Sequence, residues 1–268
     1  MINEIRIGTS GWHYASWRGP FYAADERAQA LLAAYARYFR TTEINASFYR
    51  LPAADTVRAW RDQTPGDFLF AWKASRYITH FRRIKDVDDS IKLVFGRMKF
   101  LGKKFGPGLF QLPPQMHADR DRLARFFKKL PARHQYTIEF RHSSWYAPKI
   151  FDVLRDFNVS LCLSDHRAAP APWEVTAQHV YVRGHGPQGD YSGRYTPSTL
   201  RSWARQMSRW KAEGRSVYCY FDNDQKSAAP FDALKLMELV GTMKESAPPF
   251  IRTERRGRSG ERRATPQQ

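Results

Sequence analysis

The chain has 268 residues, of which 42% are apolar and 15% aromatic, and its 44 lysines and arginines outnumber 26 aspartates and glutamates, a formal net charge of +18. This composition is that of a globular protein and excludes collagen-like and disordered chains. Because the longest apolar run, Ala30 to Ala36, is far shorter than the roughly 18 to 20 residues that cross a bilayer, we expect no membrane partner and a cytoplasmic location.

Short β-like runs alternate with segments of helical period along most of the chain. Strands are predicted at residues 4–10, 41–48, 68–74, 109–112, 136–140, 159–165, 178–183 and 216–221. Apolar residues at helical spacing fill most intervals, and Thr196 with Pro197 supplies an N-cap and a first-turn proline for the helix before the last strand. Residues 166–177 contain prolines and show no helical period, so this unit is predicted to lack a regular helix.

Eight strands interleaved with helices over about 250 residues predict an α/β fold, a TIM-barrel-like (β/α)8 barrel. An open doubly wound sheet is the alternative. We expect one domain over residues 1–250, followed by a basic, disordered tail over 251–268, because residues 252–268 hold six arginines, two glutamates and no large apolar side chain.

Strand parity predicts which side chains enter the barrel, since successive residues of a strand point to opposite faces. When the apolar residues of each strand face the helices, a polar set turns inward near the carboxyl ends. Strands one, six and eight are ambiguous by this test, so Asp165 and Asn223 are candidates only as residues at strand ends. The inward set is Glu43, Asn45, Lys73, Gln111, Glu139, Arg141, Arg183 and His185.

The charges of this set suggest a ligand. Two carboxylates face Lys73, Arg141 and Arg183, which leaves one positive charge over. A carboxylate or phosphate group would supply the missing anion, and the planar guanidinium of arginine suits both. The alternative is a structural network whose members satisfy one another, because burying charges is costly unless they are paired.

Several short strings in combination resemble the YecE-like family, a domain of unknown function (domain of unknown function 72). They are Gly8-Thr9-Ser10-Gly11-Trp12, Glu43 to Pro52, Phe70 to Ala74, Gln111-Leu112-Pro113-Pro114, Glu139-Phe140-Arg141-His142, Ser164-Asp165 and Tyr181 to Gly186. The resemblance covers roughly residues 5–240 and implies a TIM-barrel-like fold with no established reaction. It supports the importance of the inward polar set without assigning roles.

Lys73 is a candidate nucleophile. A lysine among other cations can have a lowered pKa and attack a carbonyl group to form a Schiff base. Glu43 or Glu139 would then be the acid/base, with Arg141 and Arg183 binding an anionic group. The alternative reading makes Lys73 an ion-pair partner of one of these glutamates.

Histidine and metal chemistry are further hypotheses. His185 is the best general acid/base among the histidines because Gly184 and Gly186 leave room around it. A metal-dependent phosphoesterase-like reaction would draw on Glu43, Glu139, His142, Asp165 and His185. Because the usual zinc motifs are missing from the sequence and the inward cations would repel a metal, we expect neither a metal nor another cofactor.

Nonspecific nucleic-acid binding is the non-enzymatic alternative. The tail, Arg82-Arg83-Ile84-Lys85 and Lys103-Lys104 would contact phosphates, and aromatic residues near strand ends would stack on bases. The simpler reading of those aromatics, Trp12, Tyr14, Trp17 and Trp145, is packing at the barrel mouth. Our leading prediction is a small anionic metabolite bound at the carboxyl end of the barrel. The candidate ligand-binding residues are Asn45, Gln111, Arg141, Arg183, Asp165 and Trp145, and the candidate catalytic residues are Lys73, Glu43, Glu139 and His185.

Overall fold

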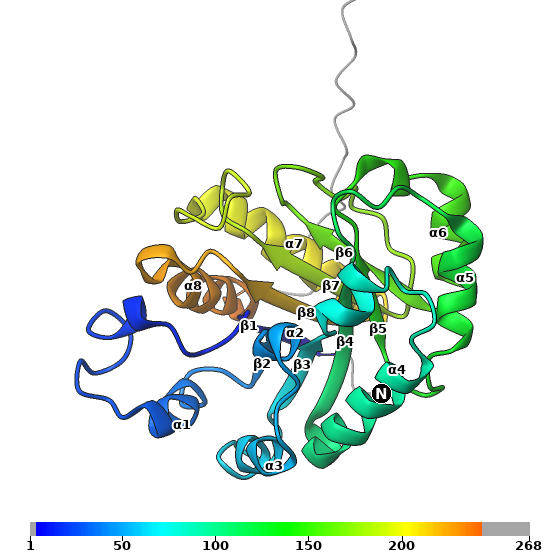
Figure 1. Ribbon diagram of the computed structural model, residues 1–268. Helices are drawn as coiled ribbons and strands as arrows, with labels where there is room; N and C mark the ends of the chain where they lie inside the picture. The colour runs from blue at the N-terminus through cyan, green and yellow to red at the C-terminus, as the bar shows by residue number, and fades with distance from the viewer. Residues whose placement is uncertain (1–3, 243–268) are drawn as a thin grey trace, which may run out of the picture.

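The computed structural model describes residues 4–242 and shows eight parallel strands surrounded by helices (Figure 1). Hydrogen bonds link the strands in the order β1-β8-β7-β6-β5-β4-β3-β2. Between β1 and β2 the barrel closes through a single parallel bridge, Ser10 with Glu43, where the Gly11 N–H donates to the Glu43 carbonyl at 2.8 Å. The predicted TIM-barrel-like fold is therefore confirmed.

The strands are short and follow one another at intervals set by the helices. They are β1 (Ile5–Thr9), β2 (Thr41–Ile44), β3 (Leu69–Lys73), β4 (Phe105–Gln111), β5 (Tyr136–Glu139), β6 (Val159–Ser164), β7 (His179–Gly184) and β8 (Ser216–Phe221). The α-helices are α1 (Leu31–Tyr35), α2 (Ala46–Tyr49), α3 (Ala54–Asp62), α4 (Asp88–Met98), α5 (Arg120–Lys128), α6 (Pro148–Asp156), α7 (Pro197–Ala212) and α8 (Ala228–Thr242). The shorter helical segments are η1 (Ala15–Trp17), η2 (Ala28–Ala30), η3 (Tyr77–Phe81, a π-helical turn), η4 (Lys99–Lys104), η5 (Ser143–Trp145) and η6 (Gln225–Ser227).

Local sequence signals fix the starts of α7 and α5, and the predicted cap at Thr196 is confirmed. The Thr196 hydroxyl accepts a hydrogen bond from the Thr199 N–H, and Pro197 opens α7. Asp119 caps α5 in the same way through the Arg122 N–H. Both caps satisfy an N–H group that the helix itself leaves without a partner. Residues 166–177, all of which the structure describes, contain no helix, as the sequence predicts.

Apolar side chains fill two separate regions. The larger core lies between the sheet and the helices, while a second cluster fills the lower part of the barrel interior, where Ala71, Leu109, Cys162, Tyr181 and Tyr220 meet. Polar groups take the upper part, at the carboxyl ends of the strands. The predicted tail over 251–268 lies outside the described residues. Over residues 4–242, no helix combines the length and the apolar character needed to cross a bilayer.

The second strand is shorter than the sequence predicts. β2 ends at Ile44, and Asn45 is the N-cap of the short helix α2. Strand parity therefore does not apply to Phe48, which was expected to face the helices and instead lies beneath the Lys73 ammonium, 4.4 Å from its ring centroid. The Ser47 hydroxyl donates to the Ile44 and Lys73 carbonyls, which holds α2 against the end of β3.

Candidate functional site

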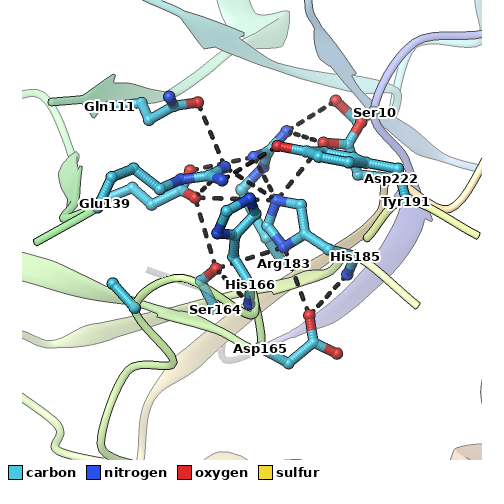
Figure 2. Close-up of polar contacts among 12 residues, drawn as sticks. Ser10, Gln111, Glu139, Ser164, Asp165, His166, Arg183, His185, Tyr191 and Asp222 are labelled. Carbon is cyan, nitrogen blue, oxygen red and sulfur yellow. Dashed lines mark hydrogen bonds and ion pairs between the residues drawn. The ribbon is translucent and has the colours of Figure 1, made fainter. Parts of the chain in front are cut away.

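Arg183, on β7, occupies the centre of the barrel interior and is fully buried (Figure 2). Its Nη2 donates to Glu43 Oε1 at 2.9 Å and to Asp222 Oδ2 at 2.8 Å, and its Nη1 donates to Glu139 Oε2 at 3.0 Å. Three carboxylates from β2, β5 and the end of β8 thus meet one guanidinium. Hydrogen bonding to charged partners at these distances is what a buried arginine requires.

Glu139 also binds a second arginine. Arg141 Nη2 lies 2.6 Å from Glu139 Oε1, and its Nη1 donates to the Tyr191 hydroxyl at 3.0 Å. Burial alone would raise the pKa of Glu139, but the guanidiniums of Arg141 and Arg183 hold the pKa well below its usual range. Glu139 therefore stays ionised, and its oxygens are engaged within the network.

Glu43 is equally engaged. Its Oε1 accepts from Ser10 Oγ at 2.5 Å as well as from Arg183, and its Oε2 accepts from the Tyr181 hydroxyl at 2.7 Å. The side chain is fully buried. The oxygens of both glutamates are therefore engaged by partners within the network, and the acid/base roles expected from the sequence stay predictions.

His185 takes part in the same network with a defined orientation. Its Nε2 lies 3.1 Å from Arg141 Nη2 and 3.0 Å from Arg183 Nη1. Because a guanidinium only donates, Nε2 must accept, which places the ring proton on Nδ1, 3.4 Å from Asp165 Oδ1. With its lone pair held by two arginines and its side chain fully buried, His185 fits a structural role better than the predicted general acid/base role.

A pocket of about 520 Å³ lies above this network at the carboxyl ends of the strands. This volume is in the range of sites that hold small molecules. Asp222 belongs both to the network and to the pocket wall. The lining residues are Gly11, Trp12, His13, Tyr14, Asn45, Ala46, Tyr49, Lys73, Tyr191, Asp222, Asp224 and Gln225.

Lys73 is the cation of this pocket. Its side chain is 8% exposed, and its ammonium lies over the Phe48 ring. In the part of the chain that the structure describes, the ammonium forms no salt bridge. Burial, followed by the nearby charge of Arg183, lowers the pKa of Lys73 to about 8, while Glu139, Asp222 and Glu43 oppose the shift. At pH 7 the ammonium is still mostly charged.

Two buried oxygens of the pocket lack a partner. Asn45 Oδ1 and Asp224 Oδ1 make no hydrogen bond to the described residues. Burial and the adjacent Asp222 raise the pKa of Asp224 to about 8. At pH 7 this carboxyl group is therefore protonated, and so neutral, in most molecules. A bound molecule with hydroxyl or amine donors would satisfy both oxygens.

The charge balance expected from the sequence needs correction. Asp222 was missed, and it gives the interior three carboxylates against Arg141, Arg183 and Lys73. The sequence predicts that Arg141 and Arg183 bind an anionic group, but in the structure both are paired with these carboxylates. Of these three cations, Lys73 is the one that lines the pocket, where the Asp222 carboxylate also lies.

Three other predicted residues are not part of the pocket lining. Gln111 Oε1 accepts from Arg141 at 3.5 Å, and Asp165 Oδ1 accepts from the backbone N–H of His185 at 2.7 Å. Asn223 points away from the barrel interior and donates to the Gly193 carbonyl and to Asp232.

Trp145, predicted to contact a ligand, is fully buried and stacks on Phe140 with ring centroids 4.7 Å apart. Its indole N–H donates to the Met116 carbonyl at 2.6 Å. This residue packs in the core because its ring covers the end of β5, so the prediction of ligand contact is not supported.

The metal hypothesis finds no support from geometry. Among residues 4–242, no three histidine, cysteine, aspartate or glutamate side chains are grouped so that they could hold a metal ion. His142, one of the proposed ligands, instead uses its Nδ1 to accept from the Ser144 N–H at 3.2 Å.

The fold and the site together define a TIM-barrel protein with an arginine-centred ion network beneath a polar pocket. The chain belongs to the family described as "Protein of unknown function DUF72", which matches residues 6–255. UPF0759 protein YunF of Bacillus subtilis (strain 168) is 25% identical over 269 residues, covering 88% of this chain and 94% of YunF. UPF0759 protein YecE of Escherichia coli (strain K12) is 31% identical over 145 residues, 53% of this chain and 50% of YecE.

Solved structures agree with this assignment. A DUF72 family protein from Thermotoga maritima MSB8 superposes with a TM-score of 0.80 at 21% identity, covering 89% of this chain and 100% of that one. A DUF72 family protein from Enterococcus faecalis V583 gives a TM-score of 0.73 at 19% identity, with 90% and 99% covered. At these identities the likeness concerns the fold.

Proposed function

We propose that the protein binds a small molecule with a carboxylate or phosphate group in the mouth pocket, and that Lys73 is the partner of that group. The observation that carries the proposal is a buried lysine that faces a pocket without a carboxylate partner among the described residues. A charged group that has lost much of its hydration is stabilised by a hydrogen-bonded opposite charge. A ligand anion would supply that charge.

The rest of the pocket indicates what else the ligand carries. Asn45 Oδ1 and Asp224 Oδ1 call for hydroxyl or amine donors. Trp12, Tyr14 and Tyr49 add aromatic surface to the walls. These features fit a compact, hydroxylated or amino-substituted acid or phosphate ester rather than a purely apolar acid.

The test is a binding screen on purified protein. Native mass spectrometry identifies molecules that copurify, and thermal shifts with a panel of carboxylates and phosphate esters at pH 7 identify those that bind. For each ligand found, we expect Lys73→Met to weaken binding by 10-fold or more, because Met keeps the apolar stem and removes the charge. Binding to the wild type should also weaken as the pH rises through about 8, where Lys73 loses its proton.

Lys103→Met is the matched control, since Lys103 is exposed and lies outside the pocket. This variant should bind as the wild type does. A Lys73→Met protein that keeps full affinity for the anionic ligands would refute the proposal. So would equal binding of neutral analogues in which the acid group is replaced by an amide.

A further inference from the structure

A second surface adjoins the mouth pocket, shares Tyr49 with the pocket wall and carries exposed aromatic rings. Phe81 is 66% exposed and Tyr49 is 67% exposed, the highest values among the large hydrophobic side chains that the structure describes as exposed, and Tyr77 is 49% exposed. Aromatic rings that are exposed to this extent in a folded protein are typical of binding surfaces when several of them lie close together. Here they come from α2 and η3, which touch where the Phe48 ring meets the His80 ring at 5.1 Å.

One arginine, Arg76, lies near two of these rings. The Arg76 guanidinium lies 6.0 Å from the Tyr49 ring centroid and 5.5 Å from the Phe81 ring centroid, so one cation is shared by two exposed rings. Such contacts attract a cation to the face of a ring. The surface therefore combines exposed rings with an arginine that lies near two of them.

Beyond Phe81 the surface becomes strongly basic. A hollow of about 640 Å³ is lined by His80, Phe81, Arg82, Arg83, Lys85 and Arg122. Two of these cations have acidic partners, Arg82 with Asp86 at 3.4 Å and Arg122 with Asp119 at 3.1 Å. Arg83 and Lys85 form no salt bridge with any residue of the described range 4–242. The hollow therefore keeps two uncompensated positive charges.

The backbone presents these two cations outward. Ile84, between them, is 3% exposed and packs in the core, and its N–H donates to the Ile78 carbonyl at 2.9 Å. Arg83 and Ile84 both have left-handed backbone conformations, with φ of 47° and 60°. Since such conformations are costly for residues other than glycine, the buried Ile84 anchor holds the loop in this form, with Arg83 and Lys85 exposed on either side.

We infer that this surface, formed by Tyr49, Arg76, Phe81, Arg83 and Lys85, binds single-stranded nucleic acid. Unpaired bases stack on exposed aromatic faces, and the phosphates between them contact arginine and lysine. Double-stranded nucleic acid offers its phosphates only, because its bases already stack on one another. The aromatics named from the sequence for this purpose include Trp17 and Trp145, which are fully buried and cannot stack on a base, so that part of the earlier hypothesis is wrong.

The test uses the full chain and fluorescence anisotropy with a labelled 20-nucleotide oligothymidine and a labelled 20-base-pair duplex, over a series of salt concentrations. We expect the wild type to bind the single strand at least 10-fold more tightly than the duplex. Arg83→Glu/Lys85→Glu should weaken single-strand binding by 10-fold or more and reduce the slope of log K against log salt by roughly one to two.

Phe81→Ala separates stacking from charge. Losing one stacked base should weaken single-strand binding by roughly 5-fold to 100-fold while the salt slope stays unchanged. Phe81 lies outside the mouth pocket, so this result is independent of the anionic ligand proposed above.

Arg201→Glu/Arg205→Glu on α7 is the matched control, because it makes the same change of charge at two exposed arginines on another helix. All variants keep the same tail, so any contribution of the tail to binding is common to them. The inference is overturned if the α7 variant loses as much affinity as Arg83→Glu/Lys85→Glu, if the duplex binds as tightly as the single strand, or if Phe81→Ala binds normally.

Discussion

Arg183 holds three carboxylates that would otherwise repel one another inside the barrel. A buried ion group of this kind adds little to stability when intact, but removing one member leaves charges that nothing compensates. We therefore expect Arg183→Met to lower the free energy of unfolding by about 3–5 kcal/mol. Urea denaturation followed by tryptophan fluorescence measures the loss.

The companion variants keep this prediction testable. Arg183→Met/Glu43→Gln/Asp222→Asn removes the two carboxylates that have no arginine or lysine partner other than Arg183, and it should recover part of the lost stability. Arg155→Met at an exposed pair, 2.9 Å from Asp152, should cost less than about 1 kcal/mol. If the triple variant were less stable than Arg183→Met alone, uncompensated charge would not be the reason for the loss.

Strand parity identifies Glu43, Glu139 and Arg183 from sequence because their strands alternate clearly between apolar and polar residues. Asp222 escapes the test because β8 carries Tyr218 and Tyr220 inward as well as apolar residues outward, so that both faces look alike. Asp222 continues the inward series of these two tyrosines beyond the end of β8. Its ion pair with Arg183 depends on the closed barrel, which the sequence alone does not position.

At the scale of elements, the sequence predicts the order of strands and helices better than their ends. The strand predicted to reach residue 48 stops at Ile44, since Asn45 caps a short helix that is held by hydrogen bonds from Ser47. Those bonds are tertiary in part, because one of them reaches the carbonyl of Lys73 on a neighbouring strand. They cannot be predicted from the secondary-structure propensities of residues 41–48 alone.

The closure between β1 and β2 requires a residue without a side chain. A Cβ atom at Gly8 would lie 2.3 Å from the Thr41 carbonyl oxygen and 2.9 Å from the Tyr35 hydroxyl. Because the first obstacle is backbone, Gly8→Ala should separate the two strands and lower the free energy of unfolding by about 1–3 kcal/mol. Chemical denaturation measures this, with hydrogen exchange of the Gly11 N–H as a local readout.

For Gly96, within α4, we expect the free energy of unfolding to change in the opposite direction. A Cβ atom there meets nothing within 4 Å, so Gly96→Ala should raise the free energy of unfolding by about 0.5–1 kcal/mol through helix propensity alone. Equal effects of the two substitutions would show that loss of glycine flexibility, rather than contact with Thr41, governs Gly8.

At the scale of the whole molecule, the buried charges set how stability depends on pH. Glu139 has a lowered pKa in the folded state, so its contribution is present above its usual pKa and is lost as the pH falls. Asp224 acts in the other direction, because its pKa rises from 3.8 to about 8 on folding. Between pH 4 and 8 the folded state therefore holds a proton at Asp224 that the unfolded chain has released, and stability falls as the pH rises through this interval.

Asp224→Asn isolates this effect, because the amide resembles the protonated carboxyl group and does not titrate. Relative to the wild type, the variant should gain stability between pH 5 and pH 8, by at most about 1.4 kcal/mol per pH unit. Urea denaturation at pH 5, 6.5 and 8 measures the difference, with Asp25→Asn at an exposed position as control. Parallel stability curves for Asp224→Asn and the wild type would mean that Asp224 is ionised in the folded protein, and the neutral pocket carboxyl group proposed beside Lys73 would then be wrong.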